Sequence, residues 1–275
     1  MPAVAGRFYP ESAAKLDREV RELLTAGKAD KPVVKASAAM APHAGYVFSG
    51  GVAGTVFSRI EIPQRVVILC PNHTGRGKRI AVVDRGAFRI PGADVPIDHE
   101  MAEAILDEFP GAEQDRDAHR FEHAIEVEIP FLLARQPALR MVPIVLSMMS
   151  EVDAIELGNA VYRACQRIGA SPGGEVLFVA SSDMSHYLPD REARRVDKMA
   201  LGPLLDFDPS ELYRTVVGHE ITMCGFIPAT AMLSFARQAN SRQPELVDYA
   251  TSADAFGDTS QVVGYAGVVI PDSAG

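Results

Sequence analysis

Three histidines, His43, His73 and His186, each follow a short apolar run by a few residues. Runs of this length and composition are typical of buried strands. In an open α/β sheet, ligands bind in the crevice just outside the carboxyl ends of the strands. The pattern therefore predicts that these imidazoles meet at one edge of a sheet, together with Asp183 from the third run.

Neutral imidazoles and a carboxylate form the ligand set of non-haem iron, zinc and copper sites, in which open positions remain for substrate or water. Cys224 is a fourth candidate, because Pro228 shortly after it suggests the first turn of a helix. The dipoles of that helix would lower the pKa of the thiol and favour the thiolate. Cys70 and Cys165 fall inside a predicted strand and a predicted helix, where a small buried side chain is the usual role.

A further histidine pair lies in the segment His119-Arg120-Phe121-Glu122-His123, which matches the H-x-x-E-H string of one group of zinc peptidases. Apolar spacing predicts one long helix over Ala118–Arg135, kinked at Pro130. On such a helix His119 and His123 share the stripe opposite Phe121. This pair is interpreted as part of a solvated face, or as a pocket lining if the kink tilts His123 inwards.

Two glycine-rich segments are candidates for a nucleotide- or phosphate-binding loop. Gly50, Gly51 and Gly54 lack the G-x-G-x-x-G spacing and a following P-loop lysine, so close helix packing is predicted for them. The basic turn Gly75–Arg79 follows His73 directly, and its Arg76 could attract an anionic substrate.

Short β-branched runs alternate with longer segments of helical period, which is typical of an α/β fold with helices covering a mainly parallel sheet. Strands are predicted near Val33–Ala41, Val66–Cys70, Ile80–Val83, Met141–Leu146, Glu175–Ala180 and Val262–Ile270. Besides Ala118–Arg135, helices are predicted at Ser12–Ala26, Gly51–Arg59, Ile97–Glu108, Val152–Ile168, Asp190–Leu205, Ser210–Val217 and Ala229–Ala239. Because Pro143 cannot donate to a ladder, its strand should be bulged or at an edge.

The composition excludes several classes of function. With 275 residues, 47% of them hydrophobic and 23% charged, the chain is typical of a globular protein with a sizeable core. A net charge of −9 disfavours nucleic acid and anionic membranes as partners. No signal peptide and no apolar run of about 20 residues is present, and three cysteines are too few for a disulfide scaffold. We therefore expect a cytoplasmic protein, and the lack of a long linker predicts one domain over residues 1–275.

Several motifs together resemble one family. They are Ala3–Pro10 (AVAGRFYP), Pro42–Tyr46 (PHAGY) with Ser49-Gly50, Pro71–His73 (PNH), Glu122–Phe131 (EHAIEVEIPF), Ser181–Tyr187 (SSDMSHY) and Cys224-Gly225. In this order they resemble the Memo family, whose bacterial and archaeal members are called AmmeMemoRadiSam system protein B. The matches run from the N-terminus to beyond residue 225, so the resemblance covers nearly the whole chain.

The resemblance implies a fold similar to the class III extradiol ring-cleavage dioxygenases, with a mainly parallel or mixed sheet flanked by helices. It implies one iron (Fe2+) or copper ion per chain, held by His43, His73 and Cys224. Asp183, His186 and His123 would then be catalytic, and Tyr46, Tyr187 and Arg76 would contact substrate. It also suggests that the chain acts with radical-SAM and AMMECR-type proteins on a small-molecule or peptide substrate.

Three functions are consistent with these residues. The first is a metal-dependent oxidoreductase, for which the soft thiolate of Cys224 favours copper(I) as well as iron and so puts ring cleavage in doubt. The second is a binding or adaptor protein that uses a vestigial dioxygenase-like pocket. The third is covalent catalysis, with Cys224 as nucleophile beside His186 and Asp183.

Overall fold

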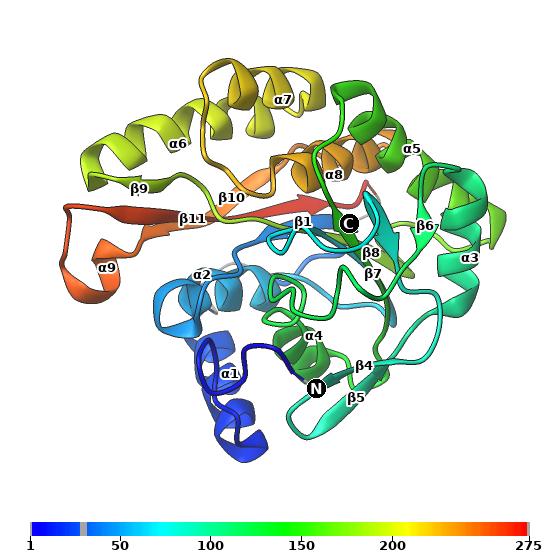
Figure 1. Ribbon diagram of the computed structural model, residues 1–275, viewed down its shortest axis with the longest axis horizontal. Helices are drawn as coiled ribbons and strands as arrows, with labels where there is room; N and C mark the ends of the chain where they lie inside the picture. The colour runs from blue at the N-terminus through cyan, green and yellow to red at the C-terminus, as the bar shows by residue number, and fades with distance from the viewer. Residues whose placement is uncertain (1, 28–31, 274–275) are drawn as a thin grey trace.

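Four parallel strands form the centre of a mixed sheet in the computed structural model, which describes residues 2–27 and 32–273 (Figure 1). Their order is β1 (Ala36–Ala41), β8 (Val176–Ser181), β2 (Arg65–Pro71) and β7 (Arg140–Leu146). Since all four run in the same direction, their carboxyl ends lie along one edge of the sheet. The predicted α/β fold with a central sheet is confirmed.

Antiparallel strands extend this centre on both sides. Beside β1 lies β11 (Val262–Pro271), followed by β10 (Glu245–Thr251), and β9 (His186–Leu188) pairs with the start of β11. Beside β7 lie β3 (Ile80–Val82) and the short β6 (Glu113–Gln114). A separate hairpin joins β4 (Ala87–Ile90) to β5 (Ala93–Pro96). The strands β4, β5, β6, β9 and β10 were not predicted, because they are short or only partly apolar.

Helices cover both faces of the sheet (Figure 1). One face carries α5 (Glu151–Arg167), α6 (Asp190–Leu205), α7 (Pro209–Gly218) and α8 (Phe226–Gln238), with α3 (His99–Glu108) against α5. The opposite face carries α1 (Ala13–Ala26), α2 (Tyr46–Ser58) and α4 (Ile129–Arg135), and the short α9 (Ala253–Phe256) follows β10. All of these helices except α4 and α9 lie within a few residues of a predicted one.

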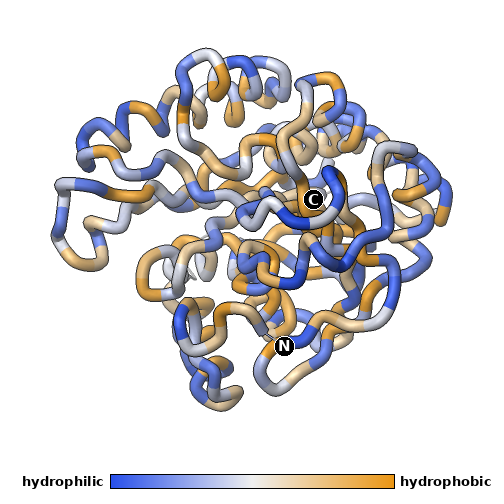
Figure 2. Tube along the Cα trace, viewed as in Figure 1, coloured by the Kyte–Doolittle hydropathy of each residue, from blue (hydrophilic) through white to orange (hydrophobic). Residues whose placement is uncertain are grey.

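The core has two layers because successive strand residues point to opposite faces. Val67 and Leu69 of β2 pack under α5 and α8, whereas Val66 and Ile68 pack towards α1, α2 and α4. Figure 2 shows polar and apolar residues alternating along the outer helices α6 and α7, as expected for helices with one face against the sheet. Among the described helices, none is long and apolar enough to cross a membrane.

The strand that contains Pro143 is an interior strand and pairs without a register shift, so neither the expected edge position nor the expected bulge is found. β7 pairs with β2 on one side and β3 on the other. The Val83 amide donates to the Pro143 carbonyl at 3.3 Å, just where β3 ends. In a strand the N–H and C=O of one residue point to the same side, so the missing donor of Pro143 faces the end of β3 and interrupts no ladder with β2.

The long helix expected over Ala118–Arg135 is also wrong, because only Ile129–Arg135 is helical. Pro130 stands in the first turn of α4, where a missing N–H costs nothing, so this proline begins the helix and does not kink it. Residues 115–128 form a chain of turns. As a consequence Phe121 is exposed and His119 is buried, the reverse of the expected helical faces.

Close packing of two helices explains two of the three clustered glycines. A Cβ added to Gly54 of α2 would lie 2.6 Å from the Leu23 carbonyl oxygen of α1, and one at Gly50 would lie 2.9 Å from the Leu23 side chain. A Cβ at Gly51, in the same helix, would meet nothing within 4 Å. The predicted packing role holds for Gly50 and Gly54 and not for Gly51.

These glycines provide a matched test of helix packing. Gly54→Ala should lower the free energy of unfolding by about 1 to 3 kcal/mol, since backbone atoms must move apart. Gly51→Ala should raise it by roughly 0.5 to 1 kcal/mol, because alanine is the better helix former and finds open space. Urea unfolding of both variants measures the difference, and equal effects would contradict the close α1–α2 contact.

Candidate metal centre

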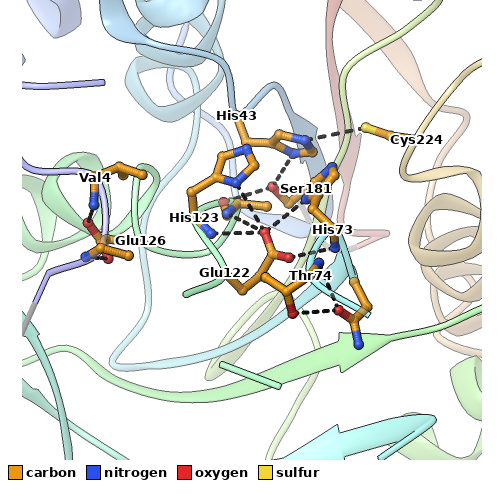
Figure 3. A network of polar contacts seen from close by, with 12 residues as sticks. Val4, His43, His73, Thr74, Glu122, His123, Glu126, Ser181 and Cys224 are labelled. Carbon is orange, nitrogen blue, oxygen red and sulfur yellow. Dashed lines mark hydrogen bonds and ion pairs between the residues drawn. The ribbon is translucent and has the colours of Figure 1, made fainter. Parts of the chain in front are cut away.

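Three imidazoles meet at the carboxyl edge of the central sheet (Figure 3). His43 follows β1 and His73 follows β2, on either side of β8. His123 comes from the turns that precede α4. One ring nitrogen from each residue lies within 4.8 Å of the other two, and the ring centroids are 4.7 to 5.4 Å apart. Of the four residues predicted to meet here, His43 and His73 do so and Asp183 lies beside His43, whereas His186 is not a member of this three-residue group.

The position and tautomer of His43 are fixed by its neighbours at the end of β8. Its backbone N–H donates to Asp183 Oδ1 at 2.9 Å, and its Nδ1 lies 2.9 Å from Ser181 Oγ. The Ser181 hydroxyl donates its one hydrogen to the Ala124 carbonyl at 3.0 Å, so it accepts from His43 Nδ1–H. Nε2 of His43 therefore keeps its lone pair, which is the form needed in a metal ligand.

Glu122 holds the other two histidines. Its buried carboxylate accepts from the His73 backbone N–H at 2.7 Å, from His73 Nδ1 at 2.9 Å and from the His123 backbone N–H at 2.9 Å. Burial raises the pKa of Glu122, but the hydrogen bonds and charge of His73, with a further bond from Ala124 N–H, outweigh it and lower the pKa to about 2. The ionised carboxylate thus places the proton of His73 on Nδ1 and leaves Nε2 available.

Two members of the cluster, His43 and His123, are uncharged at neutral pH. Burial, reinforced by the neighbouring His73, lowers the pKa of His43 well below its usual 6.5. Burial and His43 lower the pKa of His123 to about 4. Because metal ions bind the unprotonated imidazole, protons compete weakly at these two positions near pH 7.

Geometry and donor type both suit a metal ion. Two nitrogens that each lie about 2.1 Å from one ion are roughly 3 to 4 Å apart. The three imidazole nitrogens lie within 4.8 Å of one another, so small side-chain movements would bring them to that spacing. His43 is buried, His123 is half-buried and the His73 side chain is 31% exposed. The site is therefore closed on the side of the sheet and accessible from the side of His73.

The N-terminal segment braces the loop that carries His123, a role the sequence did not suggest. The Phe8 ring meets the His123 ring edge-on at a centroid distance of 4.9 Å. Glu126, buried in the same loop, accepts from the backbone N–H groups of Ala3 at 2.6 Å and Val4 at 3.0 Å, and from the Tyr9 hydroxyl at 2.7 Å. The spacing of Glu122 and Glu126 did not predict these contacts with the N-terminal segment, because the loop is not helical.

Cys224 lies beside the cluster and is not one of its three converging members. Its Sγ is 3.3 Å from His43 Nε2 and accepts from the Asp183 backbone N–H at 3.3 Å. The residue directly precedes the N-cap of α8, as expected. The pKa of its thiol, however, is raised by burial and by the charge of Asp183, contrary to the expected lowering. Loss of solvent around this partly buried sulfur outweighs the helix dipole here.

The remaining residues assigned to catalysis lie next to His43 or further out. The Asp183 carboxylate is 4.0 Å from His43 Nε2. His186 is tied to Thr222, whose hydroxyl accepts from its backbone N–H at 2.8 Å and whose carbonyl accepts from its Nδ1 at 2.9 Å. Tyr187 is 72% exposed beside the His186 ring, with a φ of +60°. Their catalytic and substrate-binding roles stay predictions.

Two residues assigned to substrate binding are engaged elsewhere. Tyr46 is buried, its ring packs against Phe131 and its hydroxyl donates to the Val127 carbonyl at 2.7 Å. Its place in the core differs from the expected pocket lining, because α2 begins at Tyr46 itself and turns that face towards α4. Arg76 is exposed, forms an ion pair with Asp117 at 3.1 Å and lies over the Phe121 ring.

The H-x-x-E-H string does not form one site. Nε2 of His119 donates to the Ala81 carbonyl at 3.1 Å, outside the three-histidine cluster. His119 and Glu126 instead line a cavity of about 660 Å3 near the β4–β5 hairpin, and none of the clustered histidines lines it. The two histidines of the string therefore serve different places, as the weak match to the peptidases suggested.

Comparison with known proteins identifies relatives over nearly the whole chain. A family model described as "Memo-like protein" matches residues 1–269. A MEMO1 family protein of Aquifex aeolicus is 40% identical over 270 residues, which are 98% of this chain and 97% of the relative. One from Methanococcoides burtonii is 38% identical over 270 residues, and one from Archaeoglobus fulgidus is 39% identical over 268, each covering 98% of both chains.

One solved structure is similar in fold alone. It is the crystal structure of an uncharacterized protein from Escherichia coli K12, with a TM-score of 0.59 at 14% sequence identity. The match covers 84% of this chain and 98% of that one.

The hydrogen bonds of Glu122 predict its effect on metal binding. Glu122→Gln removes the charge that orients His73 and sets an amide against one of the backbone N–H groups, so metal affinity should fall about 10- to 100-fold. Competition with a chelator measures the change, and Asp117→Asn, at an exposed ion pair in the same loop, is the control. Equal affinity in the Glu122 variant and the wild type would show that Glu122 does not orient these imidazoles.

Proposed function

We propose that this chain, which belongs to the Memo-like protein family, binds one iron or copper ion at His43, His73 and His123 and is a redox-active metal protein. The observation that carries the proposal is the convergence of three imidazole nitrogens within 4.8 Å. Imidazole suits zinc, copper and iron alike, and the family resemblance favours the two redox-active metals. Such an ion supplies electron transfer and open positions for a small ligand.

The residues around the cluster have complementary tasks in this proposal. Ser181 and Glu122 fix the tautomers of His43 and His73, so that both present Nε2. Asp183, 4.0 Å from His43 Nε2, is placed to hold or accept a proton at the closed side of the site. Substrate would enter from the side of His73, where Arg76 lies three residues along the chain.

The same proposal extends to partners and substrate. The family resemblance supports joint action with radical-SAM and AMMECR-type proteins on a small-molecule or peptide substrate. Two exposed side chains would contact that substrate: Arg76, three residues after His73, and Tyr187, which lies beside His186.

Metal content is the direct test of the proposed function. Protein purified anaerobically without an affinity tag should contain close to one iron or copper per chain, and His43→Ala should lose it, because the most buried ligand is gone. His219→Ala, at an exposed histidine that ends α7, should keep the metal. Elemental analysis gives the result, and full occupancy in His43→Ala would refute the site.

The third donor is tested separately, because the family resemblance named Cys224 and the geometry favours His123. His123→Ala should release the metal, whereas Cys224→Ser should retain it with an altered spectrum, since the sulfur lies next to His43 Nε2 without joining the converging nitrogens. Metal content and electronic absorption of both variants show which residue is the third donor. Metal lost from Cys224→Ser and kept in His123→Ala would reverse the assignment.

Alkylation distinguishes this proposal from covalent catalysis by Cys224. Because burial raises the pKa of its thiol, Cys224 should react with iodoacetamide at pH 8 at least tenfold more slowly than an unperturbed cysteine. The same chain unfolded in guanidinium chloride gives the reference rate. Rapid alkylation of the folded, metal-free protein at Cys224 alone would favour the nucleophile.

A further inference from the structure

Three glutamates are buried in the loop and helix start that carry His123, and one of them has no partner. Glu122, Glu126 and Glu128 are each at most 2% exposed. Glu122 and Glu126 accept hydrogen bonds at both carboxylate oxygens. Within the described ranges, neither oxygen of Glu128 has a hydrogen-bond partner. Both oxygens of Glu122 and Glu126 thus have partners, whereas Glu128 has none among the described residues.

Around Glu128 the Ser181 hydroxyl favours the charged carboxylate, but burial and the neighbouring Asp183 oppose it more strongly. Its polar neighbours are the Ser181 hydroxyl and the Asp183 carboxyl at the end of β8. The titratable groups that face it from other elements are the thiol of Cys70 on β2 and the phenol of Tyr46 on α2. In the part of the chain that the structure describes, no cationic side chain forms an ion pair with it.

The helix that starts at Glu128 does not use its charge either. Glu128 is the N-cap residue of α4, yet its side chain makes no capping hydrogen bond. An ionised carboxylate buried without partners is strongly disfavoured, whereas the protonated acid is neutral and can donate one hydrogen bond. Burial and the charge of Asp183 accordingly raise the pKa of Glu128 well above its usual 4.5.

Ser181 connects Glu128 with the metal centre. Its hydroxyl donates to the Ala124 carbonyl at 3.0 Å and accepts from His43 Nδ1–H at 2.9 Å. The second lone pair of that oxygen remains for a donor, and the Glu128 side chain is next to it. A carboxylic acid at this place can donate its proton to that lone pair, whereas a carboxylate has no proton to donate.

We propose that Glu128 is a neutral carboxylic acid that stores one proton beneath the three-histidine cluster, linked to His43 through the Ser181 hydroxyl. The role of this stored proton rests on the proposed function. A cation bound by the imidazoles adds positive charge, and release of the Glu128 proton to solvent would offset that charge. Glu128 is then a positioning and charge-balancing residue. The protonation itself requires no metal.

The test compares Glu128→Gln with the wild type in chelator-treated protein. In the wild type the folded state binds one more proton than the unfolded state above about pH 5, so stability falls as pH rises. The unfolding constant of the wild type relative to Glu128→Gln should therefore rise about tenfold per pH unit until the folded carboxyl ionises. Urea unfolding from pH 5 upwards gives this ratio.

Glu126→Gln is the matched control, because it removes a buried carboxylate that is fully hydrogen-bonded. Glu126→Gln should lower the stability of the protein at pH values where Glu128→Gln does not. A ratio for Glu128→Gln that is flat with pH overturns the proposal. A strong loss of stability in Glu128→Gln at every pH also overturns it, since Glu128 would then be an anion paired with a cation.

Two further readouts test the proton and its link to His43. An infrared difference spectrum, wild type minus Glu128→Gln at neutral pH, should show the carbonyl band of a protonated acid. The nitrogen NMR signal of His43 Nδ1 should shift when Glu128 ionises, and Ser181→Ala should remove this shift. A shift that persists in Ser181→Ala refutes the link through Ser181. Since the experiments use metal-free protein, their failure is separate from failure of the metal assignment.

Discussion

Burial of three carboxyl groups within seven residues is the constraint on which the structure of this site depends. A buried carboxylate is tolerated only when hydrogen bonds or charges replace water. Glu122 meets this requirement with His73 and the backbone of His123, which aligns two imidazoles. Glu126 meets it with the N-terminal segment, which holds Phe8 against His123. Glu122 must point towards His73 and Glu126 towards the N-terminal segment. A regular helix would place these two side chains on the same face, so the chain between them is not helical.

The sheet supplies the other half of the geometry. Parallel strands β1, β8 and β2 are neighbours, so the residues that follow them emerge side by side. β8 stands between the two histidine-bearing strands and ends at Ser181, and both Ser181 and Asp183, two residues further on, bond to His43. A single strand thus orients the most buried imidazole through its side chain and its backbone. The irregular loop then adds His123 from outside the sheet.

The chemistry of the site follows from the effect of burial on the pKa of each possible metal donor. Burial keeps His43 and His123 neutral at physiological pH, which suits metal binding. The same burial raises the pKa of Cys224, so that a proton must leave the sulfur before it can act as a thiolate donor. A site of three imidazoles with an adjacent protonated thiol differs from the expected pair of histidines and thiolate. The family to which the chain belongs shows the fold, and the local environments decide among the donors.

The sequence by itself determined the α/β class, most helices and central strands, and the meeting of His43 with His73, because apolar periodicity and position after a strand are local signals. Only the tertiary structure decided the third imidazole. Residues 118–135 have helical spacing, yet the buried glutamates and Pro130 leave only Ile129–Arg135 helical. His123 turns inwards as a result, and His119 turns towards Ala81. Partners distant in sequence, such as Glu126 with Val4 and Glu122 with His73, determine this path, and no local pattern encodes them.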